Sequence, residues 1–506
     1  MSEVSKVIIL HPNDDVAIAR FPISKGHVIQ EKNVSVLSDI KEGHKIALHN
    51  IEKNQPIKRY NQIIGYAICQ IQAGEHIHLH NLKMGDYGHE YDFCADKHET
   101  PIAREKRTFM GYKRKNGQIA TRNYIGILTS VNCSATVARR LEDHFKAKGL
   151  DDYPNIDGIV ALPQSFGCAM DMKGDLMKMM QRTMSGYANH PNFAGILIIG
   201  LGCESNQIKD LIQVKGLNEG PMLQHMTIQE TGGSQKTFDK GVTIIESMLN
   251  EANQYTREEV PASELVLALE CGGSDSYSGI SANPALGVAV DLLVQQGGTA
   301  ILAETPEIYG AEYILTRRAN TKEVGEKLIN RILWWEDYAK RCHAELNNNP
   351  SAGNKEGGLT TILEKSLGAI CKAGSTNLID VYEYAEPVTA KGLVFMDTPG
   401  YDAFACTGQI AGGANIMCFT TGRGSAYGSK PTPCIKIASN NFLWRRQEED
   451  MDINCGDVAD GQETLEQAGK RIFEKILAVA SGEKTKSEKF GYGSLEFVPW
   501  QPGAIM

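Results

Sequence analysis

The run Tyr124-Ile-Gly-Ile-Leu-Thr-Ser-Val-Asn-Cys133 sets the architecture of this chain. It is an apolar stretch that ends in small polar residues, and three similar runs follow it, at 158–168, 194–203 and 265–271. Segments with a helical apolar period, such as 136–145, separate these runs. Apolar strands that do not alternate, with amphipathic helices between them, indicate a mainly parallel sheet that is buried on both faces. We therefore predict an α/β fold for this part of the chain.

The rest of the chain divides into blocks of different composition. Residues 1–82 carry short alternating stretches separated by glycine-containing turns, which predicts a small β-rich domain. Residues 83–107 are polar and aperiodic, as is typical of a linker. An α/β domain with strand-end cysteines then spans 108–342, and a second α/β domain spans 376–506. Between them, the Gly- and Asn-rich residues 343–375 are interpreted as an ordered active-site loop.

Composition and charge exclude several classes of protein. The 506 residues suffice for roughly two to four domains. The net charge of -9 gives no basic surplus for a nucleic acid partner. No apolar run approaches the ~18 residues that span a bilayer, and no signal peptide is visible at the N-terminus. We expect a cytoplasmic protein that binds neither nucleic acid nor membrane, with its 12 cysteines reduced.

The cysteines at the strand ends recur at a regular spacing. The separation is 35 residues from Cys133 to Cys168 and again from Cys168 to Cys203, and Cys271 follows after nearly two such intervals. This interval is about one βα unit, so each thiol lies just past the carboxyl end of its own strand. These ends border one crevice in an open parallel sheet. Converging thiolates favour a soft or borderline metal, so we predict an iron site or an iron–sulfur cluster on these four thiols, with Glu204 as a further candidate ligand.

The alternative is that these cysteines are structural. A free cysteine is among the most buried residue types, so each of the four taken singly is more often a core residue than a ligand. The repeated register is what favours the ligand interpretation. The sequence also places His76, His78 and His80 on one face of a predicted strand. That alternation is compatible with a metal site, but we expect a solvent-exposed face there.

Polar residues gather where other predicted strands end. Asn206 follows Cys203 closely, Glu304-Thr-Pro-Glu307 ends a strand, and Ser274 and Asp275 follow two glycines. Arg423 stands between two glycines, as a guanidinium aimed at a carboxylate would. Glycine lets the backbone approach a small anionic, polyhydroxylated ligand closely. Taken singly, most such strings are ordinary turns. The chain has no phosphate-binding glycine motif, so nucleotide binding has no support.

Several motifs resemble one known family in order along nearly the whole chain. They are His11-Pro-Asn-Asp-Asp-Val-Ala17, Gly43-His-Lys-Ile-Ala-Leu48, Ile199-Gly-Leu-Gly-Cys-Glu204, Glu270-Cys-Gly-Gly-Ser-Asp275, Ser278-Gly-Ile-Ser-Ala-Asn-Pro284, Gly353-Asn-Lys-Glu-Gly-Gly358, Lys365-Ser-Leu-Gly368 and Thr421-Gly-Arg-Gly424. The chain resembles the altronate and galactarate dehydratases, a family of sugar-acid hydro-lyases. The resemblance implies an N-terminal SAF domain, a divalent metal that is usually ferrous iron, and a 2-keto-3-deoxy acid product. The sugar acid itself stays open between the two branches.

The resemblance also suggests roles for individual residues. We expect His11 or His44 to act as acid and base, with Asp15 as the orienting partner. A metal-bound carboxylate would stabilise the enediolate that forms on loss of the α-proton. The expected substrate-binding residues are Asn206, Ser274, Asp275, Asn354, Lys355 and Arg423. Two alternatives stay open, a C–S lyase of the sulfolactate type and a non-catalytic sugar-acid-binding protein. We expect a small sugar acid as ligand, and a homodimer.

Overall fold

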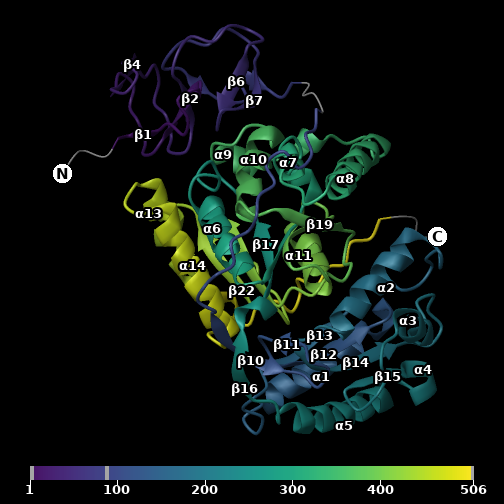
Figure 1. Cartoon of the computed structure of the whole chain (residues 1–506). Coiled ribbons are helices and arrows are strands. Elements are labelled where there is room, and N and C mark those ends of the chain that lie inside the picture. The colour runs from purple at the N-terminus through teal and green to yellow at the C-terminus, as the bar shows by residue number, and fades with distance from the viewer. Residues whose placement is uncertain (1–4, 86–89, 503–506) are drawn as a thin grey trace.

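The computed structural model describes residues 5–85 and 90–502. These form a small β domain, a middle α/β domain and a larger C-terminal α/β domain (Figure 1). Residues 1–4 of the predicted β domain and 86–89 of the predicted linker lie outside the described residues. The predicted fold class is confirmed: an antiparallel β domain precedes two mainly parallel sheets. No helix in the described chain is long and apolar enough to cross a membrane.

The N-terminal domain consists of short antiparallel strands. One sheet contains β1 (Val7–Ile8), β2 (Val16–Ala19), β5 (Lys45–Ala47) and β8 (His76–Ile77). Two smaller sheets pair β3 (Val28–Ile29) with β4 (Val34–Ser35), and β6 (Pro56–Arg59) with β7 (Gln62–Ala67) and β9 (Leu82–Lys83). In β6 the buried residues Ile57 and Arg59 alternate with half-buried ones, which fits the period of two in the sequence.

The middle domain is built on a four-stranded parallel sheet. Its order is β13 (Gly158–Leu162), β12 (Tyr124–Thr129), β14 (Phe193–Gly200) and β15 (Leu223–Thr227). The helices are α1 (Ala135–Lys148), α2 (Asp175–Ala188), α3 (Ile208–Lys215), α4 (Ile228–Thr231) and α5 (Ser234–Ala252). A small antiparallel sheet of β11 (Ile119–Ala120), β10 (Thr108–Lys113) and β16 (Arg257–Pro261) lies beside it.

The C-terminal domain contains a seven-stranded parallel sheet. Its order is β19 (Leu378–Tyr382), β20 (Gly392–Met396), β18 (Thr299–Leu302), β17 (Val266–Cys271), β21 (Ile416–Thr421), β22 (Cys434–Ala438) and β23 (Ile453–Asn454). The helices are α6 (Ala282–Gln295), α7 (Tyr313–Arg317), α8 (Lys322–Arg341), α9 (Ala352–Glu356), α10 (Ile362–Ala369), α11 (Asp402–Ala411), α12 (Asn441–Arg446), α13 (Gly456–Ala459), α14 (Leu465–Ala480) and α15 (Lys486–Lys489).

The structure divides the two α/β domains differently from the predicted boundary at 342. Strands β17 and β18, which we assigned to the 108–342 domain, pair with β21 and β20 in the C-terminal sheet. The apolar period identifies these segments as buried strands, but it carries no information about which neighbour a strand takes. Cys271 therefore lies in a different sheet from Cys133, Cys168 and Cys203. The predicted loop at 343–375 contains the two helices α9 and α10.

A buried ion group joins the N-terminal domain to the C-terminal domain. Glu364 on α10 lies 2.9 Å from Lys45 Nζ and 2.5 Å from an Arg59 guanidinium nitrogen, and all three side chains are almost fully buried. Arg59 also donates to the carbonyl of Ser276, 2.7 Å away. Burial opposes ionisation of Glu364, but the two cations outweigh it and lower its pKa to about 2. The carboxylate therefore stays charged and holds the two domains together.

We predict that Glu364→Gln strongly destabilises the protein. It leaves Lys45 and Arg59 buried without a counter-charge, so the free energy of unfolding should fall by about 3–5 kcal/mol. Urea unfolding followed by circular dichroism measures this. The control is Glu474→Gln, which removes an exposed pair with Arg107 and should cost less than about 1 kcal/mol. Equal unfolding midpoints for the two variants would contradict the assigned role of Glu364.

Candidate functional site

The candidate site lies at the carboxyl edge of the seven-stranded sheet, where the N-terminal domain covers it (Figure 1). The strand order changes direction around β17: β18 and β20 lie on one side, and β21 and β22 on the other. Ligands of open parallel sheets bind in the crevice outside the carboxyl ends of the strands at such a switch point. The loops that follow β17, β18 and β21 therefore border the expected crevice.

Acidic side chains and one thiol are packed together at this edge. Cys271 Sγ lies 4.0 Å from a Glu304 carboxylate oxygen and 3.7 Å from one of Glu307. Glu270, Glu304 and Asp402 form a second group, and the possible ligand atoms in each group all lie within 4.8 Å of one another. Gly272 makes room for this packing, because a Cβ there would lie 2.2 Å from Asp402 Oδ2.

Two lysines from the segment after α9 enter the same cluster. Lys365 on α10 places Nζ 2.5 Å from Glu307 Oε1 and donates to Asn349, 2.9 Å away. Lys372, in the short 3-10 turn Ile370–Ala373, lies 3.8 Å from a Glu304 oxygen. Both lysines are buried. The cluster thus combines four carboxyl groups and a thiol with only two cations.

This imbalance shifts the acidities of the cluster. Burial raises the pKa of Glu270 to about 8 and that of Asp402 to about 6. Burial, then the charges of Glu270 and Glu307, raise the pKa of Glu304 well above its usual value. Burial also opposes ionisation of Glu307, but Lys365 and Lys372 outweigh it and lower its pKa. Without an added cation, the cluster therefore retains protons on some of its carboxyl groups.

Glu304 is held in a strained position with one oxygen unsatisfied. Its backbone is left-handed, with φ of 69°, which is uncommon for a residue other than glycine. Its buried Oε1 accepts no hydrogen bond from any group in the described chain. A proton shared with Glu270 or a bound cation would satisfy this oxygen. Carboxylate oxygens together with the Cys271 sulfur are a donor set that suits ferrous iron or a similar divalent ion. The residues present therefore fit the metal that the sequence resemblance implies.

Three histidines of the N-terminal domain face the carboxyl end of α9. His44 Nε2 lies 3.1 Å from the carbonyl of Glu356, and His78 Nε2 lies 2.9 Å from that of Lys355. A carbonyl only accepts, so both nitrogens carry their protons. His44 Nδ1 must then accept from His76 Nε2, 2.9 Å away. The solvent-exposed face expected for these histidines holds for His80, which is exposed, whereas His76 and His78 are half-buried.

Burial keeps these histidines neutral. It lowers the pKa of His44 to about 4 and that of His76, with a further contribution from His44, to about 3. Burial also lowers the pKa of His78. A neutral imidazole is the form that accepts a proton in general base catalysis. In the described chain His76 Nδ1 has no hydrogen-bond partner, so this nitrogen is the open end of the His44–His76 pair.

Four predicted binding residues lie in the segments next to α9: Asn354 is on α9 itself, Ser274 and Asp275 follow β17, and Arg423 follows β21. Asn354 Nδ2 donates to the carbonyl of Ser274, 2.8 Å away, and the buried Ser274 Oγ has no hydrogen-bond partner within residues 5–85 and 90–502. Asp275 accepts from Ser278, Ser439 and Asn440, which satisfies its carboxylate and makes it a structural group. Arg423 lies 3.0 Å from Glu356 and is partly exposed. A small cavity bordered by Ser274, Asp275 and Lys365 opens between the two domains.

The other two catalytic candidates lie in the outer turn of the N-terminal domain. His11 Nδ1 accepts from the amide of Asn13, 3.1 Å away. Asp15 bonds to His49, 2.8 Å away, and not to His11 or His44, so the expected orienting pair does not form. Asp14 is the carboxylate that contacts the His11 backbone. Of the predicted acid–base residues, the structure brings only His44 to the interface between the domains.

The structure separates the predicted iron ligands into two groups. Cys133, Cys168 and Cys203 are exposed at the carboxyl edge of the four-stranded sheet, whereas Cys271 is buried in the C-terminal domain. Burial raises the pKa of Cys271 to about 11. The carboxylate of Glu204 accepts from Ser130 Oγ at 2.5 Å and from the backbone amides of Leu201 and Gly202. Asn206 also belongs to the four-stranded sheet, where it bonds to the carbonyl of Ser130.

Several residues of the acid cluster received no role in the sequence analysis. They are Glu270, Glu304, Glu307, Lys365, Lys372 and Asp402. The available signal was two acids three residues apart directly after an apolar run, as in Glu304-Thr-Pro-Glu307. That pattern places the acids at a strand end. It does not show that the lysines, 58 residues beyond Glu307 in the case of Lys365, fold back onto them.

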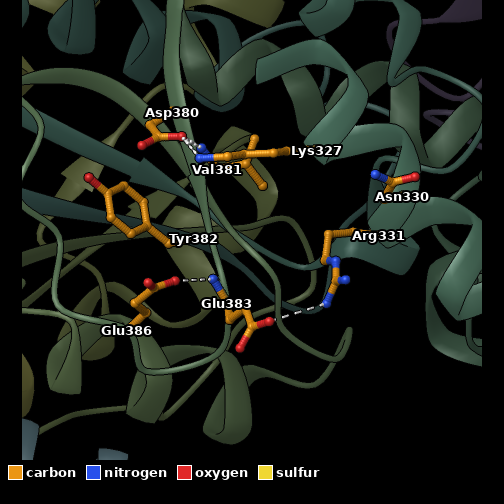
Figure 2. A pocket seen from close by; sticks show the side chains of 8 residues that line it. All are labelled: Lys327, Asn330, Arg331, Asp380, Val381, Tyr382, Glu383 and Glu386. Carbon is orange, nitrogen blue, oxygen red and sulfur yellow. Dashed lines mark hydrogen bonds and ion pairs between the residues drawn. The ribbon is translucent and has the colours of Figure 1, made fainter. Parts of the chain in front are cut away.

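A separate surface pocket lies beside α8 and β19 (Figure 2). Lys327 and Arg331 point into it from α8, and Asp380 and Glu383 face them. Lys327 lies 2.7 Å from Asp380, and Arg331 lies 4.0 Å from Glu383. These charges are exposed and paired with one another, so nothing in this pocket demands a ligand. Two buried polar atoms that lack a hydrogen-bond partner among the described residues, Glu304 Oε1 and Ser274 Oγ, follow β18 and β17 at the carboxyl edge of the seven-stranded sheet.

The fold and the site together define an α/β enzyme whose small β domain closes over buried acids and lysines at a sheet edge. Comparison with known proteins gives the family. Residues 5–85 match the model of the altronate/galactarate dehydratase SAF domain, 111–253 match the second domain of D-galactarate dehydratase/altronate hydrolase, and 262–505 match the C-terminal domain of D-galactarate/altronate dehydratase. The chain belongs to this dehydratase family, whose members are hydro-lyases.

Individual relatives cover nearly the whole chain. An altronate dehydratase of Bacillus subtilis is 36% identical over 96% of this chain and 97% of its own length. A galactarate dehydratase (L-threo-forming) of Escherichia coli is 36% identical over 96% of this chain and 92% of its length. The (2R)-sulfolactate sulfo-lyase subunit beta of Chromohalobacter salexigens is 32% identical over 76% of this chain and 96% of its length.

We predict that acid weakens the protein through its buried histidines. His44 and His76 stay neutral in the folded state down to about pH 4 and 3, but titrate near 6.5 when unfolded. The unfolded state then binds more protons below about pH 6.5, so stability should fall as pH drops from 7 towards 4. Urea midpoints at pH 7.5 and 5 measure this fall, which should be smaller in His76→Gln. The exposed control His98→Gln should keep the wild-type dependence, and an unchanged dependence in His76→Gln would contradict the prediction.

Proposed function

We propose that the protein is a sugar-acid dehydratase. It would convert an aldonate or aldarate, such as D-altronate or galactarate, to a 2-keto-3-deoxy acid by α-proton abstraction and loss of the β-hydroxyl. The observation that carries this proposal is the buried group of four acids and two lysines at the switch point, together with the neutral histidines that the N-terminal domain places against α9. Its relatives named altronate and galactarate dehydratase support the substrate class.

The reaction needs a strong electrostatic field, because a proton next to a carboxylate is very weakly acidic. Removing it creates a dianionic enediolate, which must be stabilised as it forms. We propose ferrous iron as the cofactor, held by Glu304 with its neighbours Glu270 and Asp402 or Cys271 and Glu307. When bound, a divalent ion supplies Lewis-acid stabilisation of that charge. Lys365 and Lys372 hold the carboxylates of this group in place.

The remaining groups have assignable roles in binding and proton transfer. The His44–His76 pair would accept the α-proton at His76 Nδ1, with His44 orienting the ring of His76 through its Nδ1. Arg423 and Lys355 would bind the substrate carboxylate and hydroxyl groups. Ser274 Oγ, buried without a partner, would hydrogen-bond to a hydroxyl. Asn354 positions Ser274, and Asn206 leaves the binding set because it lies in the other sheet.

A C–S lyase of the sulfolactate type is the second candidate. The observation in its favour is the sulfo-lyase subunit that aligns with this chain over 96% of its own length. Loss of sulfite instead of hydroxide needs the same α-proton abstraction, so the cluster does not discriminate between the two leaving groups. Membership of a hydro-lyase family rules against the third alternative, a non-catalytic sugar-acid-binding protein. The cytoplasmic location and the homodimer stay predictions.

A substrate panel tests the proposed function. Purified protein with ferrous iron under anaerobic conditions is given aldonates, aldarates and sulfolactate. The expected result is a 2-keto-3-deoxy acid from at least one sugar acid and no sulfite from sulfolactate. Sulfite release without any keto acid would establish the lyase alternative. Turnover of neither class would overturn the proposal.

Glu304→Gln tests the cluster itself. The substitution preserves shape but removes a charge that the proposed ion needs, so we expect kcat to fall about 100-fold or more. Ferrous iron affinity should fall at least about tenfold, while the melting temperature stays near that of the wild type. The matched control is Glu326→Gln, an exposed residue of α8 paired with Lys322, which should leave all three quantities unchanged. Full activity in Glu304→Gln would remove Glu304 from the site.

A further inference from the structure

We propose that Cys133, Cys168 and Cys203 bind an iron–sulfur cluster at the carboxyl edge of the four-stranded sheet. This site is distinct from the acid cluster and does not depend on the proposed function. All three thiols are free and exposed, although free cysteine is usually among the most buried residue types. The described chain has five exposed cysteines, and these three lie at the ends of neighbouring strands.

The strand register brings the three thiols to one edge. Thr129 of β12 pairs with Ile199 of β14, and the cysteine lies four residues beyond the paired residue in both strands. Leu128 of β12 pairs with Leu162 of β13, and the cysteines follow these residues by five and six positions. Neighbouring strands are about 4.8 Å apart, so the three chains leave the sheet across roughly 10 Å. The regular spacing in the sequence therefore corresponds to a shared position in space.

Contacts between the loops hold these positions together. The amide of Asn132 donates to the carbonyl of Phe166, 2.9 Å away, and the amide of Asn206 donates to that of Gly167, 3.0 Å away. Gly167 has φ of 118°, and a Cβ there would lie 2.3 Å from the Ser130 carbonyl oxygen. Only glycine permits this approach, which carries the Cys168 loop to the Cys133 loop. Glu204, through Ser130, ties the Cys203 loop to the same place.

The local electrostatics suit an anionic group. Each thiol precedes a helix of the middle domain: Cys133 precedes α1, Cys168 precedes α2 and Cys203 precedes α3. The amide ends of helices favour negative charge and thiolates. Gln229 Nε2 also donates to Cys203 Sγ, 3.4 Å away. Hydrogen bonds to sulfur are one of the ways in which proteins stabilise and tune iron–sulfur clusters.

The arrangement fits a cluster better than a single metal ion. Zinc binds thiolates at about 2.3 Å, which requires its sulfur ligands to lie within about 4 Å of one another. The donor groups of the described chain that fall within 4.8 Å do not include these three thiols. A cluster distributes its thiolates over separate irons and so spans wider spacings. In a four-iron cluster, three cysteines leave one iron without a protein thiolate. The three thiols are exposed, so that iron would face solvent.

Reconstitution tests this proposal directly. The full-length protein is incubated anaerobically with ferrous iron, sulfide and a thiol reductant, and is then desalted. Iron, acid-labile sulfide and visible absorption are measured for the wild type, for Cys133→Ser/Cys168→Ser/Cys203→Ser and for the control Cys69→Ser/Cys342→Ser. The wild type and the control should bind sulfide and iron together, and the triple variant should retain at least about tenfold less acid-labile sulfide, while iron held by the acid cluster stays. Glu304→Gln should bind as much sulfide as the wild type, which separates this site from the acid cluster.

A second measurement uses the wild type alone and does not depend on how the variants fold. Alkylation followed by mass spectrometry should modify all five exposed cysteines in the apoprotein. After reconstitution it should spare Cys133, Cys168 and Cys203 and still modify Cys69 and Cys342. Uptake of iron or zinc without sulfide, sulfide retained by the triple variant, or equal alkylation before and after reconstitution would each overturn the proposal.

Discussion

The attraction between Glu364 and its two cations, Lys45 and Arg59, is the constraint on which the rest of the site depends. The two cations belong to the N-terminal domain, the carboxylate belongs to α10, and water is excluded from all three. Removing charges from water is costly, so the arrangement is stable only when every partner is present. The same contact fixes the position of the N-terminal β domain relative to the carboxyl edge of the seven-stranded sheet. It thereby sets where His44 and His78 meet α9.

The acid cluster at the carboxyl edge of the seven-stranded sheet imposes a second electrostatic constraint. Parallel strands deliver Glu270 and Glu304 to adjacent positions of one edge, and the following helices add Lys365 and Lys372. The acids outnumber the lysines, so burial and mutual repulsion hold protons on some carboxyl groups, and Glu304 Oε1 stays unsatisfied. Such a site gains stability from a divalent cation, and it is also a site at which negative charge on a bound substrate can be balanced.

The positions of the four strand-end cysteines show what a sequence pattern can and cannot predict. The recurrence of Cys133, Cys168 and Cys203 predicted that their strands end together, and the register of the four-stranded sheet places these ends side by side. Cys271 follows an equally clear strand pattern, but it lies in the seven-stranded sheet of the C-terminal domain. Its strand, β17, pairs with β18 and β21, because strand partners are chosen by long-range contacts that leave no mark in local periodicity. Glu204 was itself a predicted ligand, but its carboxylate bonds to Ser130 and so ties two loops together.

The sequence by itself determined the secondary-structure elements, the β-rich start, the α/β character of the remainder and the family, because periodicity, turn residues and ordered motifs are local properties. It also predicted His44, Ser274 and Asn354 as site residues, and the structure places them near the interface between the N-terminal and C-terminal domains. Only the tertiary structure decided which strands share a sheet, that Lys365 and Lys372 reach the acids after β18, and that His44 bonds to His76. Those contacts join segments far apart in the chain, and their energies arise from burial and charge, which exist only once the domains are packed.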